Sequence, residues 1–180
     1  ISCHVYHKVH GMSVACLRFF TVYGARQRPD LAIHKFTRLI LDGKKIPVYG
    51  SGKNVRDLVF TKDVCSAISF VMRHGKGGEI YNISSGNELT NIEVVRKILS
   101  ILGKDDSWFE YVPDRPGHDL RYSVDARKLA ELGWQPKTSF EDGLRQTVEW
   151  YKSNEWWWKP MKEKMKPIAW LSGDGQQRHN

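Results

Sequence analysis

The chain has 180 residues, a length at which a chain buries about 70% of its unfolded surface, so we expect one domain or a piece of one. Lysine and arginine number 28 against 20 acidic residues, and the net charge of +8 favours anionic partners such as nucleotides, sugar nucleotides, nucleic acid or a membrane surface. No apolar run approaches the ~18 residues that cross a bilayer, no polybasic tract is present, and three scattered cysteines form neither a disulfide framework nor a metal-ligand pattern.

The first part of the chain predicts a helix followed by a buried strand. Residues 2–10 carry apolar residues at helical spacing and end at Gly11, a residue favoured just past a helix. Residues 14–20 are mostly apolar without alternation, which is typical of a strand covered on both faces in a parallel sheet. The polar segment 21–30 then follows the carboxyl end of that strand, where open α/β sheets bind ligands.

The next part predicts a helix, a hairpin and a second helix. The first helix covers about residues 31–41. Residues 46–49 and 55–60 have the composition of strands, and the glycine-containing segment 50–54 between them predicts a hairpin loop. Thr61 is expected to cap the helix that follows.

Two more strands and a helix are expected before residue 113. Residues 80–83 predict a short strand. Thr90 and Glu93 have the spacing of a capping box at the start of the next helix. Residues 108–112 predict a strand that leads into a cationic loop. Because strands and helices alternate along the chain, the sequence predicts an α/β fold with a parallel sheet.

The last part predicts two helices and a tail. Asp125 and Ser139 can cap the two helices. The tryptophans at 156–158 could stack on bases, but no basic residues are interleaved with them along a strand face, so we expect them to pack a terminal segment onto the core. We expect a structured region over residues 1–171 and a disordered tail over 172–180.

The cysteines and the start of the chain give two further expectations. Cys3, Cys16 and Cys65 lie among apolar residues, so we expect buried thiols in a reducing compartment and a cytoplasmic protein, with no membrane partner. The chain begins without Met and inside a helical pattern, so we expect it to be part of a longer chain. Alone, it would expose a sheet edge and an apolar face, so we expect it to self-associate, for example as a homodimer.

The loop over residues 114–122 contains the most distinctive chemistry. Pro116 fixes its own φ and Gly117 permits a positive φ, so the loop is bent and stiff and presents Arg115 and His118. The guanidinium fork suits phosphate, because charge-assisted hydrogen bonds contribute about 1.5–3 kcal/mol each. The alternative is a local ion pair that only shapes the loop, and residue chemistry alone does not decide between the two.

Several stretches together resemble the carboxyl-terminal half of extended short-chain dehydrogenases/reductases, and among them the NAD-dependent sugar-nucleotide epimerases and dehydratases. Residues 114–158 are most similar to dTDP-glucose 4,6-dehydratases, whereas residues 21–36 are more similar to UDP-sugar 4-epimerases. The motifs that carry the resemblance are Arg18–Gly24, Pro47–Gly52, Val55–Asp57, Tyr81–Ile83, Asp114–Tyr122 and Leu132–Trp134. The resemblance implies a partial Rossmann-like parallel sheet, made of its last strands and helices, plus the small α/β substrate-binding lobe of these enzymes.

The resemblance also implies a set of site residues. Arg56 and Arg115 would hold the diphosphate of a nucleoside-diphosphate sugar, a role we favour for Arg56 over an ion pair with its neighbour Asp57, because adjacent strand residues point to opposite faces. Asn91 and His118 would contact phosphate or ribose. The other expected substrate-binding residues are Thr21, where the family often has Asn, Leu31 and Lys35 beside the diphosphate, and Pro47, Val48 and Tyr49 beside the base. Phe20 and Tyr23 would border NAD.

The resemblance places the redox machinery of these enzymes outside this part. The glycine-rich dinucleotide fingerprint and the catalytic Tyr-x-x-x-Lys pair belong to the amino-terminal half, and we expect neither here, since Tyr6 is followed four positions later by His10. We therefore expect the substrate-binding half of an enzyme that oxidises a UDP- or dTDP-hexose at C4, with no turnover by this chain alone. A non-catalytic nucleotide-sugar-binding or scaffolding module is the alternative, and nucleic-acid binding ranks third.

Overall fold

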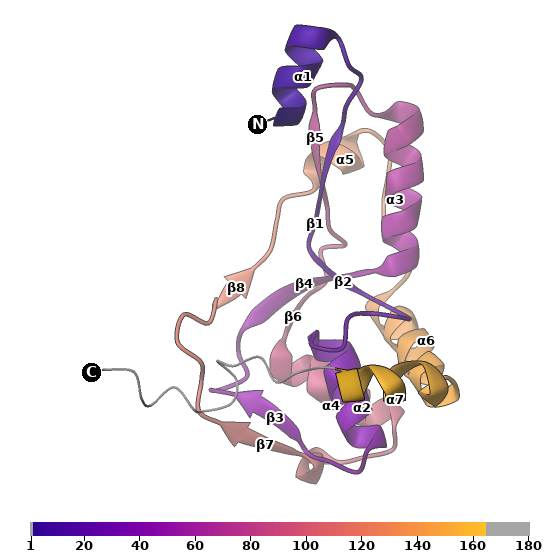
Figure 1. The fold of residues 1–180 in the computed structure, drawn as a ribbon. Helices are drawn as coiled ribbons and strands as arrows, with labels where there is room; N and C mark the ends of the chain where they lie inside the picture. Colours follow the sequence, from indigo (N-terminus) through magenta and orange to yellow (C-terminus); the bar gives the residue numbers. More distant parts are fainter. Residues whose placement is uncertain (1, 165–180) are drawn as a thin grey trace, which may run out of the picture.

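The structure is a computed structural model that describes residues 2–164. Seven helices are described there, together with one 3₁₀ turn, η1 (Asp106–Trp108) (Figure 1). The helices are α1 (Ser2–His10), α2 (Ala32–Leu41), α3 (Thr61–His74), α4 (Asn91–Ile101), α5 (Arg127–Glu131), α6 (Phe140–Ser153) and α7 (Glu155–Lys164). The tail expected over 172–180 and residues 165–171 of the expected structured region lie outside the described residues. No described helix is long and apolar enough to span a membrane.

The strands form three small groups, and most of the pairings are parallel. The strands are β1 (Cys16–Phe19), β2 (Thr21–Tyr23), β3 (Ile46–Tyr49), β4 (Val55–Phe60), β5 (Ile80–Ile83), β6 (Glu88–Thr90), β7 (Phe109–Val112) and β8 (Arg121–Tyr122). Strand β1 pairs with β5 and β3 pairs with β7, both parallel. Strand β4 pairs in parallel with β2 and β8 and antiparallel with β6. The expected α/β class with parallel sheets is confirmed.

The expected hairpin between residues 46–49 and 55–60 is wrong. Strand β3 pairs with β7, with Ile46 opposite Phe109, and not with β4. The segment between β3 and β4 turns away because Gly50 and Gly52 both have positive φ, +56° and +69°. The backbone N–H of Gly50 also donates to the carbonyl of Val112 at 2.9 Å, which extends the β3–β7 pairing beyond the strand.

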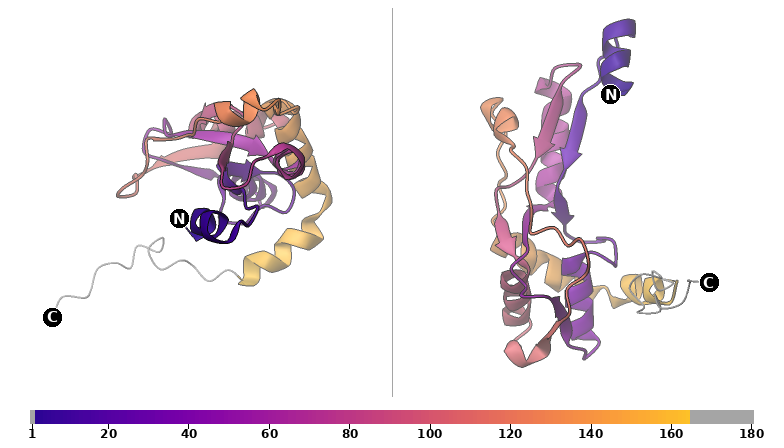
Figure 2. Two further views of the ribbon diagram at one scale, coloured as in Figure 1. Left: turned by 90° about the horizontal axis from the view of Figure 1, so that it is seen from above. Right: turned by 90° about the vertical axis from the view of Figure 1, so that its left-hand side faces the viewer.

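Strand β4 lies between two hydrophobic clusters of the described residues. Leu58 and Phe60 belong to a cluster with α2, α4 and α6, whereas Val59, between them, belongs to a cluster with α3, β5 and Trp134. Because successive strand side chains point to opposite faces, one strand contributes to both clusters. Figures 1 and 2 show the consequence, an elongated molecule with β1, β5 and α3 towards one end and α2, α4, β3 and β7 towards the other.

Two of the expected helix caps are confirmed, and the cap at Thr61 is wrong. Thr90 and Glu93 form the capping box of α4, and the Ser139 side chain accepts from the Asp142 N–H at the start of α6. At α3 the N-cap is Phe60, without a side-chain hydrogen bond, because Thr61 is already helical. Asp125 accepts from the Arg127 N–H at 2.9 Å, in the first turn of α5, whose N-cap is Ala126.

The expectation of buried cysteines is wrong. Cys3 and Cys65 are exposed and Cys16 is half-buried. Helix α1, which carries Cys3, has no buried residue, and Cys65 lies on the solvent side of α3. Apolar neighbours in sequence did not predict burial here, because a helix turns successive residues to different faces.

Candidate functional site

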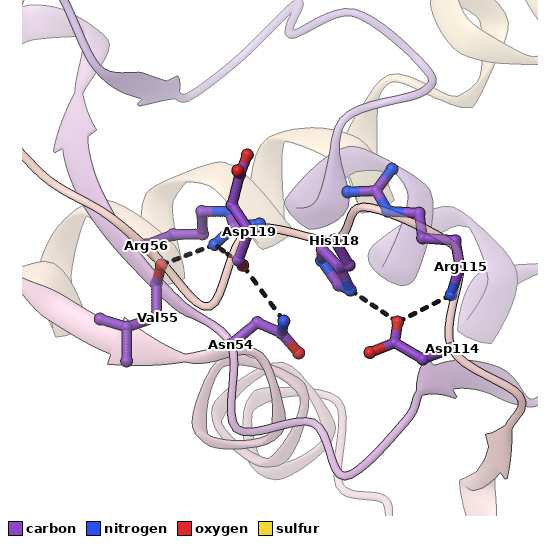
Figure 3. A network of polar contacts seen from close by, with 7 residues as sticks. All are labelled: Asn54, Val55, Arg56, Asp114, Arg115, His118 and Asp119. Atoms are coloured by element: carbon purple, nitrogen blue, oxygen red, sulfur yellow. Dashed lines mark hydrogen bonds and ion pairs between the residues drawn. The ribbon is translucent and has the colours of Figure 1, made fainter.

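The cationic loop is attached to the beginning of β4 by three hydrogen bonds. The backbone N–H of Val55 donates to the carbonyl of Leu120 at 2.8 Å. The Nη1 group of Arg56 and the Nδ2 group of Asn54 both donate to the carbonyl of Asp119, at 3.0 and 3.1 Å (Figure 3). One face of this loop is therefore held by a side chain that was expected to bind a ligand.

Within the loop, the Asp114 side chain bridges the turn between Arg115 and His118. Its Oδ1 atom accepts from the backbone N–H of Arg115 at 2.9 Å and contacts Nδ1 of His118 at 2.7 Å. This contact holds the pKa of Asp114 below its ordinary value of 3.8, with His118 as the largest cause. Gly117, at φ +68°, makes the turn between them. The His118 side chain is only 5% exposed, so it is part of the loop's own packing.

Arg56 and Arg115 lie near each other. Figure 3 shows Arg56 reaching the loop from β4 on one side of His118 and Asp119, with Arg115 on the other side. Burial lowers the pKa of Arg56, and the positive charge of Arg115 lowers it further. Lys35 shows the same pattern: burial lowers its pKa most, and Arg115 contributes again. Arg115 of the loop therefore repels both Arg56 of β4 and Lys35 of α2, which is the electrostatic setting of an anion site.

Neither alternative ion pair of the arginines is present among the described residues. The Asp57 side chain is 1% exposed and accepts from the Ser84 hydroxyl, so it points away from Arg56, as strand alternation requires. The Asp114 carboxylate contacts the backbone of Arg115 and the ring of His118, and the Arg115 guanidinium forms no hydrogen bond or ion pair within the described part of the chain. Arg115 is exposed and can donate its full fork to a ligand.

Strand β3 places the residues expected beside a base next to these cations. The ammonium of Lys35 lies 5.6 Å from the centre of the Tyr49 ring, within reach of a cation–π interaction. Pro47 and Tyr49 are half-buried, whereas the Val48 side chain is 2% exposed and belongs to the core. Contact of Val48 with a ligand would therefore use its backbone, and Tyr49 offers the accessible aromatic face.

The remaining expected residues are placed at element ends. Thr21 begins β2, opposite Leu58 of β4. Leu31 is the N-cap of α2, and Asn91 is the first residue of α4, where its N–H donates to the Asn54 carbonyl at 3.0 Å. All three are half-buried. Leu31 and Asn91 lie at helix starts, positions at which anionic ligands are commonly held, whereas Thr21 lies beside the second half of β4.

The two residues expected beside NAD differ in accessibility. Phe20 is half-buried and stacks on Tyr122, with ring centres 4.2 Å apart. Tyr23 is 1% exposed, packs against Phe60 and Phe140, and donates its hydroxyl to the Phe140 carbonyl at 3.3 Å. Contact of Tyr23 with a cofactor would therefore use its backbone.

An open depression of about 420 Å³ lies elsewhere, beside β8 and β6. Its lining residues are Glu88, Arg121, Ser123, Val124 and Asp125. The guanidinium of Arg121 is already held by both carboxylate oxygens of Glu88, at 2.7 and 3.1 Å. A cation neutralised in this way is less suited to a diphosphate than Arg115, so we do not place the ligand there.

Sequence reasoning missed Asn54 and Tyr122, and it overlooked one spacing. Asn54, 4% exposed, anchors the loop, and Tyr122 lies opposite Arg56 in the β4–β8 pairing. A Tyr-x-x-x-Lys spacing does occur, at Tyr49 and Lys53. It spans a turn that contains Gly50 and Gly52 rather than a helix, so the two side chains do not share a helical face as residues four apart in a helix do.

Comparisons with known proteins agree with the motifs. The family model described as GDP-mannose 4,6 dehydratase matches residues 1–147. The dTDP-glucose 4,6-dehydratase of Streptomyces niveus is 45% identical over 158 residues, which cover 87% of this chain and 47% of that protein. The chain thus spans about half the length of the curated relatives it matches.

Solved structures give the same result. A dTDP-glucose 4,6-dehydratase of Bacillus anthracis in complex with NAD is 45% identical with a TM-score of 0.83, covering 89% of this chain and 51% of that one. A UDP-glucose 4-epimerase of Thermotoga maritima with UDP-glucose is 33% identical with a TM-score of 0.78, covering 83% and 49%. The expected Rossmann-like relationship is confirmed. The chain therefore belongs to the NAD-dependent sugar-nucleotide dehydratase and epimerase family of extended short-chain dehydrogenases/reductases.

Proposed function

We propose that this chain supplies the part of an NAD-dependent dehydratase or epimerase that holds a nucleoside-diphosphate sugar. The observation that carries the proposal is the grouping of Arg56, Arg115 and Lys35, in which the charge of Arg115 lowers the pKa of both other cations. Such mutual repulsion costs free energy in the free protein, and an anion placed between the cations relieves it. A diphosphate supplies two adjacent negative groups.

The donors that remain in this group suit a diphosphate bridge. Arg56 uses Nη1 for the carbonyls of Val55 and Asp119, at 2.7 and 3.0 Å, and keeps Nε and Nη2 for a ligand. Arg115 keeps its whole fork. Charge-assisted hydrogen bonds of this kind contribute about 1.5–3 kcal/mol each, so a few of them support micromolar binding. Tyr49 would then face the base, at the end of β3.

The described residues supply only an edge of a cofactor site. Phe20 is half-buried and stacks on Tyr122, whereas the Tyr23 ring is in the core, and the sequence contains no G-x-G-x-x-G fingerprint. NAD, when bound in enzymes of this family, accepts a hydride from the sugar. The residues of this chain bind and orient the sugar nucleotide, and we propose no proton transfer by any of them.

Titration calorimetry on the natural full-length protein tests the proposal. Heat is measured on adding UDP, dTDP, and the monophosphates UMP and dTMP as controls. We expect micromolar binding of at least one diphosphate and at least tenfold weaker binding of its monophosphate, because the monophosphate lacks the second charged group that the arginines would hold. No heat with either diphosphate would contradict the proposed function.

We also propose that the protein self-associates, as a homodimer or otherwise. The support is the apolar surface of α1 and the segment after it, where Val5, Tyr6 and Val9 of the helix and Met12 beyond it are each about half exposed or more. Light scattering after size-exclusion chromatography measures the mass. A monodisperse monomer across micromolar concentrations would contradict self-association and would leave the binding proposal unaffected.

A further inference from the structure

Tyr122 lies directly opposite Arg56. The two are register partners in the parallel pairing of β4 with β8, so their side chains stand side by side on one face of the sheet. The guanidinium carbon of Arg56 lies 6.0 Å from the centre of the Tyr122 ring. The negative face of the ring attracts this cation.

The Tyr122 ring is itself held in place. It stacks on Phe20 with an angle of 25° between the ring planes and 4.2 Å between their centres. Phe20 immediately precedes β2, which pairs with the other half of β4. Tyr122 is 48% exposed, so burial in the core does not explain the position of its ring. The ring contacts Phe20 and the guanidinium of Arg56.

Together these contacts restrict the guanidinium of Arg56 on two sides. The Asp119 carbonyl binds Nη1 at 3.0 Å, and the Tyr122 ring lies beside the guanidinium carbon. A long side chain loses rotamer entropy when it is ordered. Contacts that order it before the ligand arrives remove that cost from binding. The free donors of Arg56 are then presented in one direction.

We propose that Tyr122 is a positioning residue for diphosphate binding and that it acts through Arg56. The proposal rests on the proposed function, since it concerns the same site. Tyr122 needs no contact with the ligand in this role, and its hydroxyl is dispensable. The aromatic face is the group that matters, because the face supports the guanidinium and stacks on Phe20.

A double-mutant cycle on the full-length protein tests this. Affinity for UDP or dTDP, whichever binds the wild type, is measured by calorimetry for Tyr122→Phe, Tyr122→Ala, Arg56→Ala and the double variant Arg56→Ala/Tyr122→Ala. Tyr122→Phe keeps both ring contacts, and we expect its affinity within about twofold of wild type. Tyr122→Ala should bind about three- to tenfold more weakly, the loss that corresponds to one aromatic contact. In the Arg56→Ala background the alanine at 122 should change affinity by less than about twofold.

Each other outcome overturns the inference. Independent effects of Tyr122→Ala and Arg56→Ala, or an equal loss in Tyr122→Phe, would mean that Tyr122 acts on the ligand directly or only on stability. Far-UV circular dichroism and the urea midpoint show whether each variant is folded. If Tyr122→Ala does not fold, Tyr122→Leu replaces it, because leucine retains apolar contact without an aromatic face. If Arg56→Ala weakens binding and Tyr122→Ala does not, only this inference is contradicted. If the wild type does not bind, the proposed function is contradicted as well.

Discussion

The Nη1 group of Arg56 donates a hydrogen bond to the backbone carbonyl of Asp119 at 3.0 Å. This bond joins β4 to the cationic loop, and Arg115 in that loop makes no comparable bond with its guanidinium in the described part of the chain. The two arginines proposed to bind one diphosphate therefore differ in what they do without it. In the proposed site, Arg56 serves both the structure and binding, whereas Arg115 serves binding.

This difference gives a first prediction. Arg56→Ala should weaken UDP or dTDP binding by about 2 kcal/mol and also lower the free energy of unfolding by about 0.5–1.5 kcal/mol, since it removes a loop hydrogen bond. Arg115→Ala should weaken binding by a similar amount and change stability by less than about 0.5 kcal/mol. Calorimetry and urea unfolding measure the two quantities.

Arg127→Ala is the matched control for both arginines. Its side chain is 84% exposed and pairs only locally with Asp125, so we expect neither affinity nor stability to change beyond about 0.5 kcal/mol. A loss of affinity in Arg127→Ala as large as in Arg115→Ala would show that net charge, and not the arrangement of cations, governs binding.

A second prediction concerns pH. His118 holds the pKa of Asp114 below 3.8 in the folded protein, so the carboxylate stabilises the fold above pH 3.8 and this contribution is lost as the pH falls through the folded pKa. Asp114→Asn lacks the contribution. The difference in unfolding free energy between wild type and variant should therefore be largest near pH 7 and shrink on acidification below 3.8. Urea unfolding at pH 3 to 7 measures it, and a constant difference would argue against this contact.

A third prediction separates the tryptophans of α7. Trp158 is 1% exposed and donates its indole N–H to the Tyr151 carbonyl at 3.0 Å, whereas Trp156 is 69% exposed. Trp158→Ala should lower the free energy of unfolding by about 3–5 kcal/mol, and Trp156→Ala by less than about 0.5 kcal/mol. Thermal and urea unfolding compare them. Equal effects of the two variants would contradict the packing role of this segment.

A fourth prediction tests the cap that places Asn91. The Thr90 hydroxyl accepts from the Glu93 N–H at 3.3 Å, and the Glu93 carboxylate accepts from the Thr90 N–H at 2.7 Å. Thr90→Ala should cost about 1 kcal/mol of stability, while Thr90→Ser, which keeps the hydroxyl, should cost a few tenths. Urea unfolding measures both. If the serine variant lost as much stability as the alanine variant, the threonine methyl group and not the cap would be what stabilises α4.

Local features of the fold could be predicted from the sequence. The capping box at Thr90 and the cap of α6 at Ser139 each follow from residues three positions apart, and both are confirmed. The partners of strands could not be predicted in this way. Strand β3 pairs with β7, far away in sequence, and the nearest candidate, β4, was chosen wrongly. Burial of a cysteine depends on the same long-range arrangement.

In the candidate site, too, local features could be predicted from the sequence and long-range partners could not. Motifs placed Arg56 and Arg115 on the correct elements, a strand start and a bent loop, and the roles expected of the ten substrate residues stay predictions. The motifs did not reveal Asn54 or Tyr122 as partners of the loop and of Arg56, because both roles depend on the register of β4 with β8. Registers between distant segments are fixed by the folded chain as a whole.

Leu58, Val59 and Phe60 of β4 face alternate sides, so both hydrophobic clusters include residues of the same short strand. If either cluster unfolds and β4 is lost, the other cluster loses packing partners as well. We expect the described part of the chain to lose its structure in a single cooperative transition, with the amides of β4 among the last to exchange with deuterium. A ligand that binds at the beginning of this strand would then protect residues of both clusters, including those it never touches.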